Sequence, residues 1–206
     1  MKQLAIIGAS GHGKVIADIA RRIGYSDIVF LDDDENVSEC GGYPVIGRSS
    51  KARMMDADLI VGIGNASDRK RIQESLPVGK IVTLIHPNTV IAEDVVLGEG
   101  TVIMAGAVVN PGVKVGRGSI INTCSSVDHD CIVGDYVHIA VGSHLCGSVS
   151  VGNETWIGAG AIVNNNVSIC QNCMIGAGAV VISDIKNVGT FVGVPAKRIN
   201  IDKTKK

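Results

Sequence analysis

The chain has 206 residues, enough for one or two domains with a buried core, and its formal net charge is −1. This charge balance gives no electrostatic basis for binding nucleic acid or an anionic membrane surface. Hydrophobic residues make up 46% of the chain but aromatic residues only 3%, and there are 26 glycines. A core built from small and aliphatic side chains favours regular, repeating β structure over a helical bundle.

The beginning of the chain carries no sign of export. The apolar run in "MKQLAIIGASG" is too short for a secretory signal and meets glycines at once. No stretch is long and apolar enough to span a bilayer. We therefore predict a cytoplasmic protein without membrane insertion, in which the six cysteines stay reduced.

The first 65 or so residues have the pattern of an α/β domain. The apolar run "QLAII" predicts a strand, "GASGHG" a glycine turn, and "KVIADIARRIGY" a helix with apolar spacing at Val15, Ile16, Ile19, Ala20 and Ile23. "DIVFLDDD" and "ADLIVGIGN" predict two further strands, and "SDRKRIQESL" a short helix. Strand–helix–strand order predicts a parallel, Rossmann-like sheet. We assign residues 1–84 to this domain and its linker.

A six-residue period governs the second half. Every sixth residue from Ile85 to Val181 is Ile, Leu or Val, and every sixth residue from Thr89 to Ile185 is small or aliphatic. A helix has a period of 3.6 and a strand a period of 2, so only a hexapeptide repeat explains both registers. We predict an all-β parallel β-helix of triangular section over residues 85–199, with both positions pointing inward and coils stacked about 4.8 Å apart. Residues 200–206 form a polar tail.

The same register decides how "CQNC" is interpreted. Cys173 and Cys131 fall on the small inward position, so each is predicted to be a buried small residue rather than a ligand. No second CxxC completes a zinc site, and we expect no metal.

The second-half register resembles that of the left-handed β-helix acyltransferases of the hexapeptide-repeat family, over roughly residues 85–194. The segments "GASGHG", "FLDDD", "VGIGN", "LIHP", "NTCSSVDHDC" and "GVPAKR" resemble its sugar acetyltransferase subfamily with an N-terminal Rossmann-like domain. That subfamily includes the bacillosamine-pathway N-acetyltransferases and the sialic-acid O-acetyltransferases. The resemblance implies left-handed coils, acetyl-CoA as co-substrate, and a homotrimer with active sites between subunits.

For function, the resemblance implies N-acetylation of a UDP-linked 4-amino-4,6-dideoxy sugar. The alternative is O-acetylation of sialic acid or a related sugar. A third hypothesis is a β-helix that binds without catalysing a reaction.

Acetyl transfer to an amine needs a group that removes a proton, and histidine suits this role at neutral pH. His129 lies two places after the inward Val127, so its ring should face outward. The resemblance implies that His129 is the general base and that Asp130 orients it. The sequence itself leaves open whether Asp128 or Asp130 does so.

Other residues are assigned by the resemblance. His138, also outward in the register, should contact the thioester region of acetyl-CoA, and Asn122 should help to bind substrate. Ala159 and Ala177, in the two "IGAGA" turns, should offer backbone contacts to acetyl-CoA. Lys197, like Arg198 beside it, either meets the CoA phosphates or belongs to a solvated tail.

The glycine turn "GASGHG" predicts a nucleotide site, because it follows a strand and opens a helix. The acids at 32–34 end the next strand, about 20 residues on, as a ribose-binding acid does. Alone this suggests NAD, but the glycine order is G-x-x-G-x-G and only about three strands are present. A UDP-type sugar nucleotide fits better, and the resemblance agrees. The residues expected near phosphate or sugar are Ser10, Gly11 and His12; those near uracil or ribose are Asp32 and Asp33; Gly64 lies beside the pocket.

Overall fold

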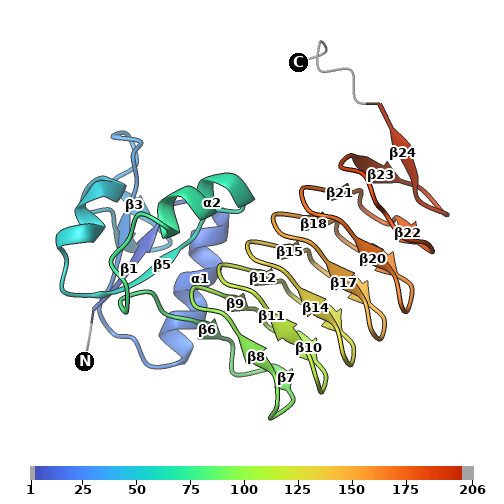
Figure 1. The fold of residues 1–206 in the computed structure, drawn as a ribbon. Coiled ribbons are helices and arrows are strands. Elements are labelled where there is room, and N and C mark those ends of the chain that lie inside the picture. The colour runs from blue at the N-terminus through green and yellow to red at the C-terminus, as the bar shows by residue number, and fades with distance from the viewer. Residues whose placement is uncertain (1–2, 201–206) are drawn as a thin grey trace.

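The computed structural model describes residues 3–200. An N-terminal α/β part packs against the side of a long β-helix (Figure 1). Both halves of the predicted architecture are therefore confirmed. Within residues 3–200, no helix has the length and apolar character needed to cross a bilayer.

The N-terminal part is built on a three-stranded parallel sheet of order β2-β1-β5. Its strands are β1 (Leu4–Ile7), β2 (Ile28–Leu31) and β5 (Asp58–Val61). The other elements are α1 (Gly11–Arg22), a short hairpin of β3 (Glu39–Cys40) and β4 (Tyr43–Pro44), a 3-10 helix (Ser49–Met54) and α2 (Ala66–Gln73). The hairpin was not predicted.

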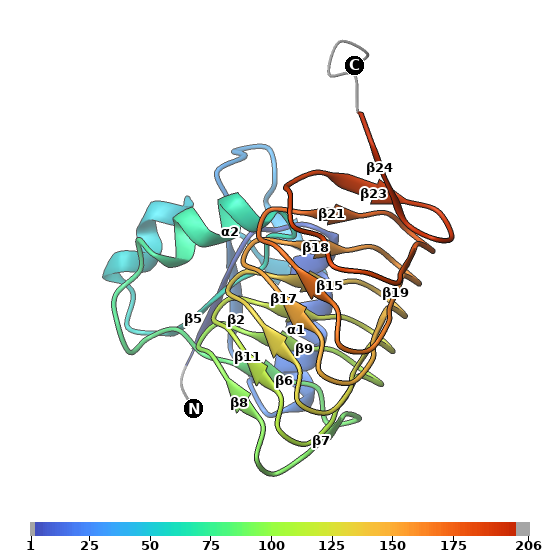
Figure 2. The ribbon, with the colours of Figure 1, turned by 45° about the vertical axis from the view of Figure 1, so that its right-hand side comes forward.

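The two faces of this small sheet pack against different partners. Leu4 and Ile6 pack with α1 and with the β-helix, whereas Ala5 and Ile7 pack on the other side with Ile72 and its neighbours. This alternation follows from the period of two in a strand. Helix α1 is thus placed between the sheet and the β-helix, as Figure 2 shows.

The predicted helix from Lys14 onward is confirmed, but its predicted buried face is partly wrong. Ile16, Ile19 and Ala20 are buried, whereas Val15 is 41% exposed and Ile23 is 42% exposed. Val15 lies outside the buried face of the helix. Ile23 is the C-cap residue, beyond the last helical residue.

The β-helix has three faces, each a parallel stack of short strands; the first face alone ends in an antiparallel strand, β24, which pairs with β23. The first face holds β6 (Leu84–Ile85), β9 (Val102–Ile103), β12 (Ile120–Ile121), β15 (His138–Ile139), β18 (Trp156–Ile157), β21 (Met174–Ile175), β23 (Thr190–Val192) and β24 (Lys197–Ile199). The second face holds β7 (Val90–Ile91), β10 (Val108–Val109), β13 (Ser126–Val127), β16 (His144–Leu145), β19 (Ile162–Val163) and β22 (Val180–Val181). The third face holds β8 (Val96–Leu97), β11 (Lys114–Val115), β14 (Ile132–Val133), β17 (Ser150–Val151) and β20 (Ser168–Ile169).

The interior of the β-helix follows the predicted register. A continuous core runs from Ile103 to Ile185 and alternates the aliphatic and small positions. The prediction of a buried inward residue is wrong at Ile85, which is 36% exposed. Its strand β6 is the end strand of the first face, so no coil covers it from below, while its neighbour Leu84 is buried against the N-terminal part.

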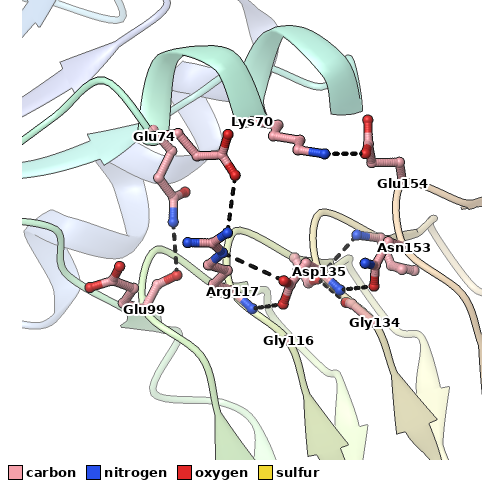
Figure 3. Close-up of polar contacts among 12 residues, drawn as sticks. Lys70, Glu74, Glu99, Gly116, Arg117, Gly134, Asp135, Asn153 and Glu154 are labelled. Carbon is pink, nitrogen blue, oxygen red and sulfur yellow. Dashed lines mark hydrogen bonds and ion pairs between the residues drawn. The ribbon is translucent and has the colours of Figure 1, made fainter.

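Helix α2 lies along the corner where the third face turns into the first (Figure 3). Lys70 pairs with Glu154 at 2.7 Å, and Glu74 pairs with Arg117 at 3.0 Å. The Gln73 amide donates to the Glu99 carbonyl at 3.1 Å. Because these contacts reach the turns of successive coils, they fix the N-terminal part along the length of the β-helix.

Candidate functional site

The structure separates the predicted catalytic residues into two places. Asn122 and His138 lie on or beside the first face, which the N-terminal part covers. His129 and Asp130 lie in the turn from β13 on the second face to β14 on the third. In a single chain these two groups occupy different corners of the triangular β-helix.

His138 points away from the β-helix interior, as its register predicts, but it is not free. It is only 5% exposed, because its ring lies against Trp156, with ring centroids 4.1 Å apart. The ring centroid of His12 lies 6.1 Å from that of His138. His138 therefore belongs to a buried cluster between the two parts of the molecule.

The hydrogen bonds of Asn122 fix the tautomer of His138. The Asn122 Oδ1 accepts the backbone N–H of Thr123 at 2.7 Å, so its Nδ2 faces His138 Nε2 at 2.9 Å. Nδ2 is a donor, so Nε2 accepts and the proton of the neutral ring lies on Nδ1. That Nδ1 is a buried donor that forms no hydrogen bond within the described residues.

Both buried histidines are held in the neutral form. Burial, followed by the positive charge of Arg69 and then by His12, lowers the pKa of His138 to about 3. Burial and then Arg69 lower the pKa of His12 to about 4. His12 Nε2 is likewise buried without a partner in the described part of the chain.

His129 has the opposite environment. Its side chain is 58% exposed, and its Nδ1 lies 2.8 Å from Asp130 Oδ2. Asp128 instead accepts the backbone N–H of His129 at 2.8 Å and the side-chain amide of Asn110 at 2.7 Å. The hydrogen bond that His129 donates to Asp130, followed by the charge of Asp128, raises the pKa of His129. With Asp130 on Nδ1, the Nε2 atom is left to act as a base.

Gly147 supports the His129 ring from the next coil. A Cβ at this glycine would lie 2.5 Å from His129 Nε2 and 2.7 Å from Cε1, closer than real Cβ contacts come. The Ser148 N–H donates to the His129 carbonyl at 2.9 Å. The ring therefore rests on a surface that only glycine leaves open.

A third set of predicted site residues, those expected to contact acetyl-CoA through their backbone, lies along the corner between the first and second faces. Along this corner Gly142 N–H bonds Thr123, Gly160 N–H bonds Val141, and Gly178 N–H bonds Ala159, each at 2.8–2.9 Å. Ala159 and Ala177 are exposed in successive turns of this line, and Asn122 lies at its lower end. The predicted stacking of the two "IGAGA" turns is thus observed. Lys197 and Arg198 are exposed on β24, beyond the last full coil.

Of the predicted nucleotide residues, only Asp32 and Asp33 line a cavity of about 240 Å³ at the carboxyl end of the small sheet; Ser10, Gly11, His12 and Gly64 lie outside its lining. Its lining includes Gly8, Asp32, Asp33, Ser49 and Arg71. Asp32 has a structural contact as well, because its Oδ2 accepts the Ala9 N–H of the glycine turn at 2.6 Å. Asp33 is bound by the backbone and hydroxyl of Ser49, which lower its pKa.

The rest of the glycine turn lies around the start of α1. Gly13 is required there because a Cβ would come within 2.3 Å of the Gly8 carbonyl. Ser10 and Gly11 are exposed at the helix N-terminus, and His12 turns inward toward His138.

A second cavity of about 450 Å³ lies between the N-terminal part and the β-helix. Gly64 and Asn65 line it from the N-terminal side, and Glu154, Trp156 and Met174 from the β-helix. Gly64, predicted beside the same pocket as Asp32 and Asp33, lines this second cavity instead. Trp156 was not identified from the sequence, where it occupies an ordinary outward position before Ile157.

The cysteines provide no metal site in the described residues, where no group of three or more potential ligands occurs. Cys131 and Cys173 are buried, as the register predicts. Burial, followed by the hydrogen bond with Cys170 Sγ at 3.4 Å, raises the pKa of the Cys173 thiol to about 12.

Comparisons with known proteins agree on both parts of the chain. Residues 3–76 match the PglD N-terminal domain, and residues 94–128 and 148–183 match the bacterial transferase hexapeptide family (six repeats). The chain is 30% identical to GDP-perosamine N-acetyltransferase of Escherichia coli O157:H7, over 73% of each protein. It is 37% identical to UDP-N-acetylbacillosamine N-acetyltransferase of Bacillus subtilis (strain 168), over 51% of this chain and 52% of that protein. The second alignment thus spans about half the length of the relative.

Solved structures are similar over nearly the whole chain. The acetyltransferase domain of PglB from Neisseria gonorrhoeae FA1090, in complex with acetyl coenzyme A, is 39% identical with a TM-score of 0.93, covering 96% of this chain and 99% of that one. PerB from Caulobacter crescentus, in complex with CoA and GDP-perosamine, is 34% identical with a TM-score of 0.92, covering 97% and 98%.

Proposed function

Since this chain belongs to the PglD-type, hexapeptide-repeat nucleotide-sugar N-acetyltransferases, which use acetyl-CoA, we propose that its acceptor is a UDP-linked 4-amino-4,6-dideoxy sugar. The observation that carries the proposed chemistry is the exposed His129 ring held by Asp130 at 2.8 Å.

His129 is the general base of this proposal. The neutral sugar amine attacks the thioester carbonyl carbon, and its proton passes to His129 Nε2 as the C–N bond forms. The C–S bond then breaks, and the CoA sulfur takes up the proton held on His129 Nε2, so that CoA leaves as the thiol and His129 is neutral again. Asp130 holds Nδ1–H, which orients Nε2 and stabilises the imidazolium that forms.

His138 is proposed to bind the acetyl carbonyl oxygen. Its Nδ1–H is buried and unpartnered, and Asn122 on Nε2 keeps the proton on Nδ1. A fixed donor in a water-poor place stabilises the negative charge that develops on that oxygen. Acetyl-CoA would then follow the corner that carries Ala159 and Ala177, and Lys197 is assigned to its phosphates.

The proposal requires more than one copy of the chain. His129 lies at the corner of the second and third faces, whereas His138 faces outward from the first. An active site that uses both must take His129 from a neighbouring subunit. This supports a cyclic homo-oligomer with each site between two subunits, and we propose the homotrimer that the family resemblance implies.

The nucleotide is assigned to the cavity with Asp32 and Asp33. The choice of a uridine nucleotide follows the similarity to a UDP-sugar N-acetyltransferase. His12 lies near His138 of the first face, and we assign Ser10, Gly11 and His12 to the phosphates and the sugar. The named relatives include both a UDP-sugar and a GDP-sugar enzyme. They share N-acetylation of a nucleotide-linked amino sugar, whereas the identity of the nucleotide is our proposal.

The experiment supplies acetyl-CoA with one acceptor at a time and follows free thiol. The acceptors are a UDP-linked and a GDP-linked 4-amino-4,6-dideoxy sugar, and sialic acid as a hydroxyl acceptor. We expect thiol release with the UDP-sugar at the highest kcat/KM and an alkali-stable amide product. A higher kcat/KM with the GDP-sugar would overturn the nucleotide assignment, and an alkali-labile ester from sialic acid alone would overturn N-acetylation.

A further inference from the structure

Arg69 is a buried cation that none of the roles above uses. It is 1% exposed, the largest fully buried side chain among the described residues. The neighbouring carboxylate of Glu154 is paired with Lys70 instead. Burying a guanidinium is costly unless its donors are bonded, so its hydrogen bonds indicate its role.

Its donors join two parts of the molecule. Nη1 donates to the carbonyl oxygens of Ile63 and Gly64, at 2.9 and 2.7 Å, in the segment between β5 and α2. Nε donates to Gly118 at 2.6 Å and Nη2 to Tyr136 at 2.7 Å, in the turns of two successive coils. One rigid, planar group therefore sets the distance between the N-terminal part and the β-helix.

The segments that it joins line the proposed substrate path. Ile63 lines the cavity assigned to the nucleotide, and Gly64 lines the larger cavity beside Trp156. Tyr136 is two residues before His138 on the same coil. A shift of the Ile63–Gly64 segment relative to that coil would change the distance between a bound sugar nucleotide and His138.

The positive charge of Arg69 also acts on the two histidine rings beside this path. Two titratable rings share the buried cluster: His12 from α1 and His138 from β15. The positive charge of Arg69, on α2, disfavours a second positive charge on either ring. A protonated His138 would make Nε2 a donor and lose its hydrogen bond with the Asn122 amide.

We propose that Arg69 is a positioning residue for acetyl transfer, which fixes the Ile63–Gly64 segment against the turns at Gly118 and Tyr136, and whose charge adds to the burial that keeps the rings of His12 and His138 uncharged. Its effect on turnover rests on the proposed function, whereas its effect on the two rings does not. The two effects are measured separately.

The first measurement follows the imidazole nitrogens by NMR over pH, without substrate. In the wild type, His12 and His138 should stay neutral below pH 6, with the His138 proton on Nδ1. Arg69→Met should raise both titration midpoints, because it removes the cation and loosens the burial. Arg22→Met, which removes an exposed guanidinium paired with Asp18 on α1, should leave them unchanged. Wild-type rings that titrate near pH 6.5 would overturn the proposal even if Arg69→Met fails to fold.

The second measurement separates geometry from charge. Arg69→Lys keeps the cation but cannot reach four carbonyls with a planar fork. We expect its histidines to stay neutral while kcat falls about 10²-fold, the effect of a small misplacement, with the KM for acetyl-CoA little changed. Wild-type kcat in Arg69→Lys would overturn the geometric role. If the wild type itself fails to acetylate any acceptor, the proposed function fails while the NMR result still decides the role of Arg69 toward the rings.

Discussion

Asp130 contacts the ring of the residue directly before it in the chain, with 2.8 Å between its Oδ2 and His129 Nδ1. Asp130 has a φ of 59°, a left-handed conformation that Asp tolerates better than most residues. Asp128, the other neighbour, bonds the backbone of His129 and Asn110 instead. Of the two acids that the sequence left open, the structure places Asp130 on the ring.

This contact predicts a pH dependence. The Asp130 hydrogen bond raises the pKa of His129 above its usual 6.5, and a base works only when unprotonated. The rate should therefore rise with pH through a midpoint above 6.5. Asp130→Asn should move that midpoint to lower pH and lower the plateau of kcat against pH, whereas Asp128→Asn should largely keep the plateau. A midpoint that does not move in Asp130→Asn would contradict this.

Removing the ring tests the base directly. His129→Ala should lower kcat by about 10²-fold or more, the usual contribution of a general base. The KM for acetyl-CoA should change little, because His138 and the Ala159–Ala177 turns are intact. His144→Ala is the matched control, since His144 is an exposed histidine on the second face. A rate near that of the wild type would remove His129 from the proposal.

Gly147→Ala tests whether the ring position matters. The new Cβ would lie 2.5 Å from His129 Nε2, so the ring must move. We expect kcat to fall about 10-fold. In the His129→Ala background the same change should have no further effect, because the ring it displaces is gone. Equal losses in both backgrounds would assign the effect to the backbone.

The local parts of this molecule were predictable from sequence. The six-residue period runs unbroken through the core, so nearly every inward residue follows from it, and it fails at Ile85 because a repeat does not reveal where the stack ends. The contact between His129 and Asp130 was also within reach, since it lies inside one turn.

The environment of His138 was not predictable. It depends on Trp156, one coil later, and on His12 and Arg69 from the N-terminal part. The register indicates that His138 points outward, but no local pattern indicates that another part of the chain covers that face. Arg69 lies in a polar helical stretch, "SDRKRIQESL", where a solvated charge is the ordinary interpretation.

Asn122→Asp tests the tautomer of His138. The amide Nδ2 of Asn122 faces His138 Nε2, whereas a carboxylate oxygen there would attract a proton to Nε2. The ring would then lose its Nδ1 proton or become charged, and either change removes or alters the proposed donor. We expect the ¹⁵N shifts to report protonation at Nε2 and kcat to fall about 10-fold or more. An unchanged tautomer would contradict the assignment of the Asn122 bond.

The separation of His129 from His138 predicts complementation between inactive chains. His129→Ala and His138→Ala should each be nearly inactive as pure oligomers. The two variants are unfolded together in equal amounts and reassembled. With random assembly in a cyclic oligomer, about a quarter of the junctions should contain one neighbour with an intact His138 and another with an intact His129. About a quarter of the wild-type rate should therefore return, measured as free thiol from acetyl-CoA. If both histidines served one site within a single chain, every site in the mixture would carry a defect, and no activity would return.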